Sequence, residues 1–317
     1  MISIVLALPV FIVGVLFLWK GSVILVDGTS KTAAHLGISS LIISVILVGF
    51  GTSAPEFAIS VGAAIQNNSD ISLGNIIGSC VANLLLVLGV AAIVRPIKVK
   101  KGVMRREFPI MFGATAVLLI SSFFGLLDVH HWIGGVFFLV LFAAFVTYFV
   151  ICAKKERKDE KKLDTGKNLK NILFIILGII GVIAGAWLLI ESAVAIAEFL
   201  QINPFIIAIS MVAVGTSLPE LVVSSTAAYK NEHDIAIGNV LGSNVFNIFL
   251  ILGFAALFIP LNAMVSLNHI WILFAVTLVM FPILITGNVI SRKEGVFMLA
   301  LYSVFMWYIF FGYTIFS

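Results

Sequence analysis

The chain has 317 residues, of which 61% are hydrophobic and only 11% are charged, and its formal net charge at pH 7 is +4. Its mean hydropathy of +1.19 lies far above that of soluble globular proteins, so the composition excludes a soluble protein and predicts a polytopic one whose partner is the lipid bilayer. The basic residues gather in a few short loops, which indicates membrane topology and no nucleic-acid partner.

In chain order, ten hydrophobic stretches are long enough to cross a bilayer, which takes about 20 residues each. They fall near residues 2–26, 36–66, 71–94, 107–127, 131–152, 170–198, 202–229, 235–258, 268–287 and 294–314. The first stretch lacks a preceding basic segment and a small-residue cleavage site, so we expect a retained helix and not a signal peptide. The sequence therefore predicts an all-α membrane protein of ten transmembrane helices, five in each half.

The second and seventh stretches belong to a segment that occurs twice, at residues 51–89 and again 164 residues later. Both copies contain Gly-Thr-Ser-x-Pro-Glu, then Gly-Asn, then Gly-Ser-x-Val-x-Asn, and they align without a gap. Of the 39 aligned positions 20 are identical, and these include hydroxyl, amide and carboxylate side chains, which chance similarity between apolar helices would not reproduce. Such groups are costly inside a membrane unless they serve an ion or substrate path.

The number of spans in each half is odd, so the second copy must begin on the opposite side of the membrane and the repeats are inverted. We expect residues 1–152 to form the first five-helix repeat, with its motif at 49–89. Residues 170–317 are expected to form the second, with its motif at 213–253, and the hydrophilic residues 153–169 to form a charged linker. Inverted repeats recur in secondary transporters, whose ion sites lie near the midplane where broken helices of the two halves meet.

The lysines and arginines set the expected orientation. If the N-terminus lies outside, all nineteen of them fall on the inner side of the membrane. The positive-inside rule then predicts a multi-pass protein of the plasma membrane with both termini outside and the 153–169 linker in the cytoplasm.

A proline interrupts each repeated motif. Pro55 has no N–H to donate and its ring crowds the preceding turn, so we expect unpaired backbone oxygens around Gly49 to Gly51. Pro219 predicts the same around Ala213 to Gly215. Unpaired carbonyls cannot face lipid, so they are expected to line a cavity near the middle of the membrane.

The polar side chains of the two motifs are all oxygen donors. Their spacing places each threonine near its glutamate on one helix, and each serine near its asparagine on the next. The set consists of Thr52, Glu56, Ser79 and Asn83 in the first repeat and Thr216, Glu220, Ser243 and Asn247 in the second. Hard cations such as Ca²⁺ and Na⁺ take oxygen ligands, whereas a zinc or copper site would need histidine or cysteine, which are not arranged for it. We expect transported ions and no cofactor.

Two other functions have to be weighed. An intramembrane protease needs a base beside its serine or a pair of aspartates, and no histidine or aspartate lies at the depth of the motif serines, so the sequence does not indicate an enzyme. A cation channel also uses charged rings and carbonyls, but inverted repeats with discontinuous helices favour alternating access.

The motif pairs GTSAPE with GSCVAN, and GTSLPE with GSNVFN, resemble the two alpha repeats of the sodium/calcium exchangers, within the cation/calcium exchanger superfamily. The likeness covers nearly the whole chain and is to the minimal prokaryotic type. It implies an antiporter that exchanges Na⁺ for Ca²⁺ at a single central site, electrogenically with three Na⁺ per Ca²⁺, and functional as a monomer. A Ca²⁺/H⁺ antiporter on the same scaffold is the alternative, although its branch carries a Gly-Asn-Ala type sequence where this chain has Gly-Thr-Ser.

By motif position, the resemblance implies that Glu56 and Glu220 are the main Ca²⁺ ligands, shared with Na⁺. The other implied ligands are Thr52, Ser53, Ser79, Thr216, Ser217 and Ser243 and the carbonyl oxygens of Gly49 and Ala213, with Asn83 beside them. Many relatives have aspartate where this chain has Asn247, and potassium-dependent exchangers rely on that acid. The site is therefore expected to hold two carboxylates with a neutral amide next to them.

Overall fold

The computed structural model of the chain describes residues 4–156, 165–201, 215–285 and 288–309. The helices of the first half are α1 (Ile4–Leu36), α2 (Ser40–Ile43), η1 (Ser44–Val48), α3 (Gly49–Thr52), α4 (Ala54–Ile65), α5 (Ser69–Ala82), η2 (Asn83–Val87), α6 (Leu88–Val94), η3 (Val103–Glu107), α7 (Phe108–Phe123) and α8 (His131–Glu156), where η marks a π-helical segment. Those of the second half are α9 (Thr165–Phe199), α11 (Leu218–Tyr229), α12 (His233–Val245), η5 (Phe246–Ile251), α13 (Leu252–Phe258), α14 (Leu267–Ile285) and α15 (Arg292–Trp307). Two short strands, β1 (Ile97–Lys98) and β2 (Val289–Ile290), pair antiparallel.

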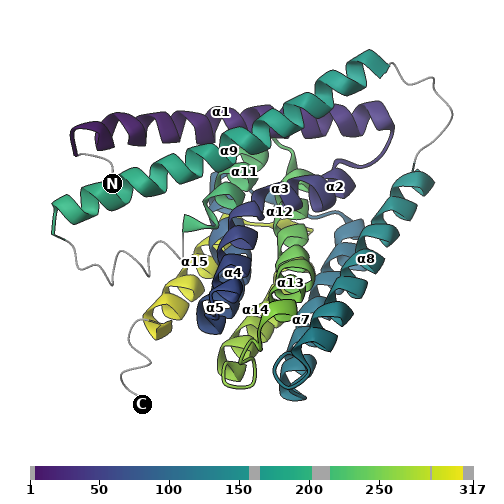
Figure 1. The fold of residues 1–317 in the computed structure, drawn as a ribbon. Coiled ribbons are helices and arrows are strands. Elements are labelled where there is room, and N and C mark those ends of the chain that lie inside the picture. The colour runs from purple at the N-terminus through teal and green to yellow at the C-terminus, as the bar shows by residue number, and fades with distance from the viewer. Residues whose placement is uncertain (1–3, 157–164, 202–214, 286–287, 310–317) are drawn as a thin grey trace.

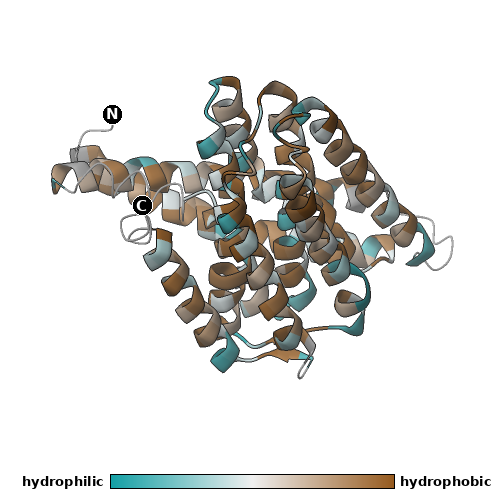
Figure 2. Cartoon of the chain, turned by 90° about the horizontal axis from the view of Figure 1, so that it is seen from below, coloured by the Kyte–Doolittle hydropathy of each residue, from teal (hydrophilic) through white to brown (hydrophobic). Residues whose placement is uncertain are grey.

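The prediction of an all-α membrane protein is confirmed. Within the described residues, six helices are individually long and apolar enough to cross a membrane, and the bent run from α2 to α4 makes a seventh. Of the ten predicted stretches, the seventh has the longest part outside the described residues, positions 202–214. Hydrophobic residues cover the helices, whereas hydrophilic ones gather at helix ends and in loops (Figure 2).

The helices α1 and α9 are longer than the sequence indicates, at 33 and 35 residues. The first predicted stretch ends near residue 26, but α1 continues to Leu36. At about 1.5 Å per residue, α1 is about 50 Å long and exceeds a hydrocarbon core of about 30 Å, so it has to tilt or project beyond the core. The two long helices lie side by side along one edge of the molecule (Figure 1).

Glycines set the packing of α1 against α9. A Cβ atom built on Gly21 would lie 2.8 Å from the backbone nitrogen of Val182, and one built on Gly28 would lie 3.0 Å from that of Ile175. Residue numbers rise along α1 as they fall along α9, so the two helices are antiparallel. Close backbone approach of this kind needs small residues at the interface.

The predicted break in the second span is confirmed at Ser53. The run from Ser40 to Thr52 and the run from Ala54 to Ile65 meet there at a bend of 48°. Ser53 has φ −81° and ψ 8°, and its counterpart Ser217 has nearly the same values, φ −85° and ψ 5°. A proline follows each serine in the first turn of the next helix, where the missing N–H costs nothing.

Two central runs of helix, α5 to α6 and α12 to α13, are largely buried within the protein. Each contains a π-helical segment at the matched position: η2 begins at Asn83, and η5 contains Asn247. π-helical turns widen the helix locally and are frequent at functional sites. In both repeats this irregularity falls at the asparagine of the motif.

Loops that the sequence assigns to the inner side meet at one face of the protein. Lys230 lies 2.5 Å from a carboxylate oxygen of Asp27, and Lys100 lies 2.5 Å from one of Asp234. The pairing of β1 with β2 joins the segment after α6 to the segment before α15 at the same face. These contacts agree with the predicted grouping of basic loops.

Candidate ion-binding site

Two glutamates from different repeats lie buried at the centre of the site. Glu56 is in the first turn of α4 and Glu220 in the first turn of α11, and both are 0% exposed. The hydroxyl of Ser53, three residues before Glu56, donates to Oε1 of Glu220 over 3.2 Å, so the two helix starts that carry the carboxylates meet. Neither oxygen of Glu56, and only Oε1 of Glu220, accepts a hydrogen bond from the described residues. Buried carboxylates are costly unless they are paired or hold a cation, so the arrangement calls for a positive charge.

Hydroxyl groups surround each carboxylate in a crossed pattern. Ser79 of the first repeat and Thr216 of the second face Glu56, and their hydroxyl oxygens lie 3.1 Å apart. In the mirrored position, Thr52 and Ser243 face Glu220, and their oxygens lie 3.4 Å apart.

Ser53 adds a third hydroxyl at Glu220, donating to Oε1 over 3.2 Å. The hydroxyl of its counterpart Ser217 is buried without a partner among the described residues. The structure therefore brings together both glutamates and six predicted hydroxyl side chains: Thr52, Ser53, Ser79, Thr216, Ser217 and Ser243. None of the six is more than 3% exposed.

Two asparagines that the sequence analysis did not include hold the threonines. Oδ1 of Asn239 accepts the hydroxyl of Thr52 over 3.0 Å, and Oδ1 of Asn75 accepts that of Thr216 over 3.4 Å. Each asparagine donates through Nδ2 to the carbonyl of the glutamate in its own repeat, at 3.4 Å in both cases. The repeated Gly-Asn pair of the motif was the available signal for these residues.

The backbone near the first break departs from the prediction. The carbonyl of Gly49 is not unpaired, because it accepts the N–H of Ser53 over 3.2 Å, and that of Gly51 also accepts a backbone N–H at the helix end. The tight turn at Ser53 restores bonds that Pro55 would otherwise remove. The predicted ligand Ala213 lies outside the described residues.

Gly49 nevertheless lies beside the hydroxyl groups. Its carbonyl oxygen lies 3.4 Å from the hydroxyl oxygens of both Thr52 and Ser243. A Cβ atom at position 49 would lie 3.0 Å from the backbone nitrogen of Ser243. Glycine therefore permits this close approach of α3 to α12 without displacing the backbone.

The two predicted amides are both 0% exposed. Asn83 donates through Nδ2 to Oδ1 of Asn244 over 3.0 Å, and its own Oδ1 has no partner among the described residues. Asn247 has no hydrogen bond from either amide atom within the described part of the chain. The two amides are thus matched in sequence but differ in their bonding.

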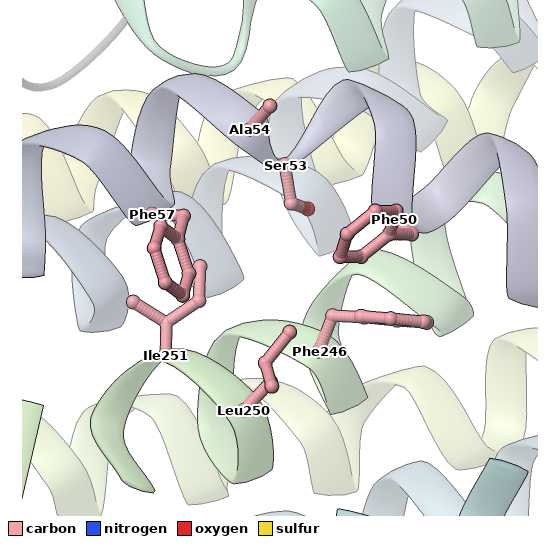
Figure 3. Close-up of a pocket in the computed structure, with 7 residues that line it drawn as sticks. All are labelled: Phe50, Ser53, Ala54, Phe57, Phe246, Leu250 and Ile251. Carbon is pink, nitrogen blue, oxygen red and sulfur yellow. The ribbon is translucent and has the colours of Figure 1, made fainter. Parts of the chain in front are cut away.

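An apolar cavity of about 140 Å³ adjoins the site at the break (Figure 3). The hydroxyl of Ser53 points into a space flanked by the rings of Phe50, Phe57 and Phe246. Its lining offers a cation almost no oxygen atoms, so the cavity itself does not suit a hard cation.

The donor set suits a hard cation. The described residues contain no group of three or more His, Cys, Asp and Glu side chains that could hold a metal ion. The site instead combines two carboxylates with neutral oxygens, the ligand types that Ca²⁺ and Na⁺ take. Its elements come from two inverted halves that pack against each other.

Comparison with known proteins agrees with this geometry. The family model described as "Sodium/calcium exchanger protein" matches residues 6–151 and 170–311 of the chain. The chain belongs to the sodium/calcium exchanger family. It is therefore a multi-pass membrane transporter of the cation/calcium exchanger kind and not an enzyme.

Individual relatives match over nearly their whole length. Sodium/calcium exchanger MaX1 of Methanosarcina acetivorans is 34% identical, with 94% of this chain and 96% of the relative covered. An uncharacterized membrane protein of Methanocaldococcus jannaschii is 33% identical, with 95% and 97% covered. The solved structure of the sodium-calcium exchanger NCX_Mj soaked with 10 mM Na⁺ and zero Ca²⁺ superposes with a TM-score of 0.83 at 32% identity, covering 95% of this chain and 98% of that one. This match agrees with two inverted five-helix repeats.

Proposed function

We propose that this exchanger moves Ca²⁺ against Na⁺ by alternating access at one central site. The observation that carries the proposal is the pair of buried carboxylates, Glu56 and Glu220, of whose four oxygens only one accepts a hydrogen bond from the described residues. Two such charges in a buried site are stable only with compensating cations. One Ca²⁺ or several Na⁺ ions supply that compensation in turn, which makes the two ions compete for the same place.

The two glutamates are the shared ligands. The neutral ligands are the hydroxyls of Thr52, Ser53, Ser79, Thr216, Ser217 and Ser243, the carbonyl oxygens of Gly49 and Ala213, and the amide of Asn83. Asn247 is a neutral neighbour that adds no charge. Because each carboxylate is surrounded by hydroxyls of both repeats, a rearrangement of one repeat against the other would change both ligand shells at once, as alternating access requires.

The charge of the site sets the stoichiometry we propose. Two carboxylates with one Ca²⁺ are neutral, whereas the same carboxylates with three Na⁺ carry one positive charge, so each cycle moves one net charge. A tenfold Na⁺ gradient contributes about 1.4 kcal/mol per ion, and about 100 mV contributes about 2.3 kcal/mol per charge. Three Na⁺ and one charge supply about 6.5 kcal/mol, enough for a Ca²⁺ gradient between about 10⁴ and 10⁵, whereas two Na⁺ without a charge support only about 10².

We place the protein in the plasma membrane as a monomer, with both termini outside and the 153–169 linker in the cytoplasm. The asymmetry of lysine and arginine supports this orientation. The grouping of Lys100 and Lys230 at one face supports it as well.

The test is Ca²⁺ uptake into proteoliposomes with the Na⁺ and proton gradients imposed separately. We expect uptake with internal Na⁺ and no pH gradient, and faster uptake when valinomycin and K⁺ impose an interior-positive potential, because the exiting Na⁺ carries the excess positive charge. Uptake driven only by a proton gradient would show a Ca²⁺/H⁺ antiporter. Na⁺-driven uptake whose rate does not change with the membrane potential would contradict the electrogenic stoichiometry but not Na⁺/Ca²⁺ exchange itself.

A further inference from the structure

Cys80 and Asn244 occupy the same position in the two repeats, 164 residues apart, and they meet at the boundary between them. Nδ2 of Asn244 donates to the carbonyl oxygen of Cys80 over 3.3 Å, and the thiol of Cys80 lies 4.0 Å from the carbonyl oxygen of Asn244. The backbone contact is thus reciprocal, but the two side chains differ. Only Asn244 carries a side-chain amide, whereas Cys80 carries a thiol.

The contact fixes the orientation of a second amide. A carbonyl oxygen only accepts, so the atom of Asn244 that meets Cys80 must be Nδ2, and Oδ1 of Asn244 must point the other way. That oxygen accepts Nδ2 of Asn83 over 3.0 Å. Asn83 is consequently held with its own Oδ1 free, and this atom is buried with no partner among the described residues.

The mirrored contact is weaker on the other side. By the repeat symmetry, Cys80 should hold Asn247 as Asn244 holds Asn83, and the sulfur of Cys80 does face the Asn247 amide. A thiol is only a weak donor and acceptor. Both amide atoms of Asn247 are buried without a regular hydrogen bond in the described part of the chain, so only the weak contact with the thiol is there to orient this amide.

We propose that Asn244 is a positioning residue for cation binding, which presents Asn83 as a preorganised oxygen donor while Cys80 leaves Asn247 free to reorient. The inference rests on the proposed function and deepens it. Without Asn244, Asn83 can turn its NH₂ group toward the cation. Binding must then turn its Oδ1 back toward the cation, which costs free energy. A side chain that is already held in the binding orientation avoids this cost. The site therefore has one fixed and one adjustable amide.

Two substitutions separate this role from packing. Asn244→Cys installs the residue of the other repeat and releases Asn83, and we expect the half-saturating Ca²⁺ concentration for uptake to rise about fivefold, the effect of one net hydrogen bond, with the maximal rate little changed. Cys80→Ala is the matched control, because Asn244 donates to the backbone carbonyl of residue 80 and keeps its partner. This control should stay within about twofold of the wild type. Equal half-saturation in Asn244→Cys and the wild type would overturn the proposal.

A second measurement does not depend on transport. In protein labelled with ¹⁵N-asparagine, the side-chain amide of Asn83, assigned by its loss in Asn83→Asp, should show the downfield proton shift of a hydrogen bond in the wild type and in Cys80→Ala. We expect Asn244→Cys to lose that shift and Cys80→Asn to create one at Asn247. An unchanged Asn83 signal in Asn244→Cys would refute the positioning role. If the wild type shows no Na⁺-driven uptake, the proposed function fails while these spectra still decide the role of Asn244.

Discussion

The hydroxyl of Thr52 lies 3.0 Å from Oδ1 of Asn239, a residue of the other repeat. Nδ2 of Asn239 is already committed to the hydroxyl of Ser224 at 3.0 Å and to the carbonyl of Glu220. The proton of Thr52 therefore points toward Asn239, and lone pairs of its oxygen are left for a cation. Each repeat orients the threonine of the other in this way.

Loss of the hydrogen bond that orients Thr52 should weaken ion binding without unfolding the protein. We predict that Asn239→Ala raises the half-saturating Na⁺ concentration for Ca²⁺ uptake about five- to tenfold, since one buried hydrogen-bond network is lost. Asn75→Ala should act alike through Thr216. The measurement is the Na⁺ dependence of uptake in proteoliposomes, with Asn171→Ala on α9, outside the site, as the control. Unaltered Na⁺ dependence in both site variants would refute the assigned role.

The glutamates should be indispensable for transport. Glu56→Gln and Glu220→Gln keep the side-chain shape but remove one of two charges, and we predict that uptake falls at least about 100-fold, the scale of breaking one partner from a buried ionic group. Glu232→Gln, which alters a carboxylate that accepts the hydroxyl of Ser30 and is not among the proposed ligands, is the control and should transport normally. Wild-type rates in either site variant would show that the ion binds elsewhere.

The same variants should separate binding from stability. Because the two carboxylates repel each other when no cation is bound, we predict that Glu56→Gln unfolds at a higher temperature than the wild type in ion-free buffer. Ca²⁺ should raise the unfolding temperature of the wild type by mass action but leave that of the variant unchanged. Thermal unfolding of detergent-solubilised protein with and without Ca²⁺ tests this. A variant that Ca²⁺ still stabilises would contradict the two-carboxylate site.

Asn247 should be a neutral neighbour of the glutamates. We predict that the wild type needs no K⁺, and that Asn247→Asp keeps exchange near neutral pH but becomes more sensitive to pH. Like-charge repulsion and burial oppose ionisation of a third carboxyl group there, so the new side chain keeps its proton and remains close in shape to an amide. Uptake between about pH 6 and pH 9, with and without K⁺, measures both effects. A K⁺ requirement in the wild type would be inconsistent with this site.

The orientation can be tested with surface cysteines in a protein whose own two cysteines are replaced. Gln66, after α4, and Lys154, near the end of α8, are both exposed. We predict that a membrane-impermeant thiol reagent labels Gln66→Cys from outside and Lys154→Cys only from the cytoplasm. Labelling of both from one side would contradict the inverted topology.

The sequence alone determined the membrane class, the helical spans, the inverted repeats and the oxygen-rich donor set. These features depend on local hydropathy and on an internal alignment, both of which are properties of a linear chain. It also located the break, because proline acts on the turn that precedes it. The bend at Ser53 confirms that prediction, although the carbonyl of Gly49 is satisfied after all.

Only the tertiary structure decided which groups meet. Spacing along a helix predicts that Thr52 lies near Glu56, but in the folded protein Thr52 faces Glu220 and is held by Asn239. The hydrogen bond between Asn83 and Asn244 could not be predicted for the same reason. Contacts between residues of the two halves depend on how the inverted repeats interlock, and side-chain periodicity reports only the neighbours within one helix.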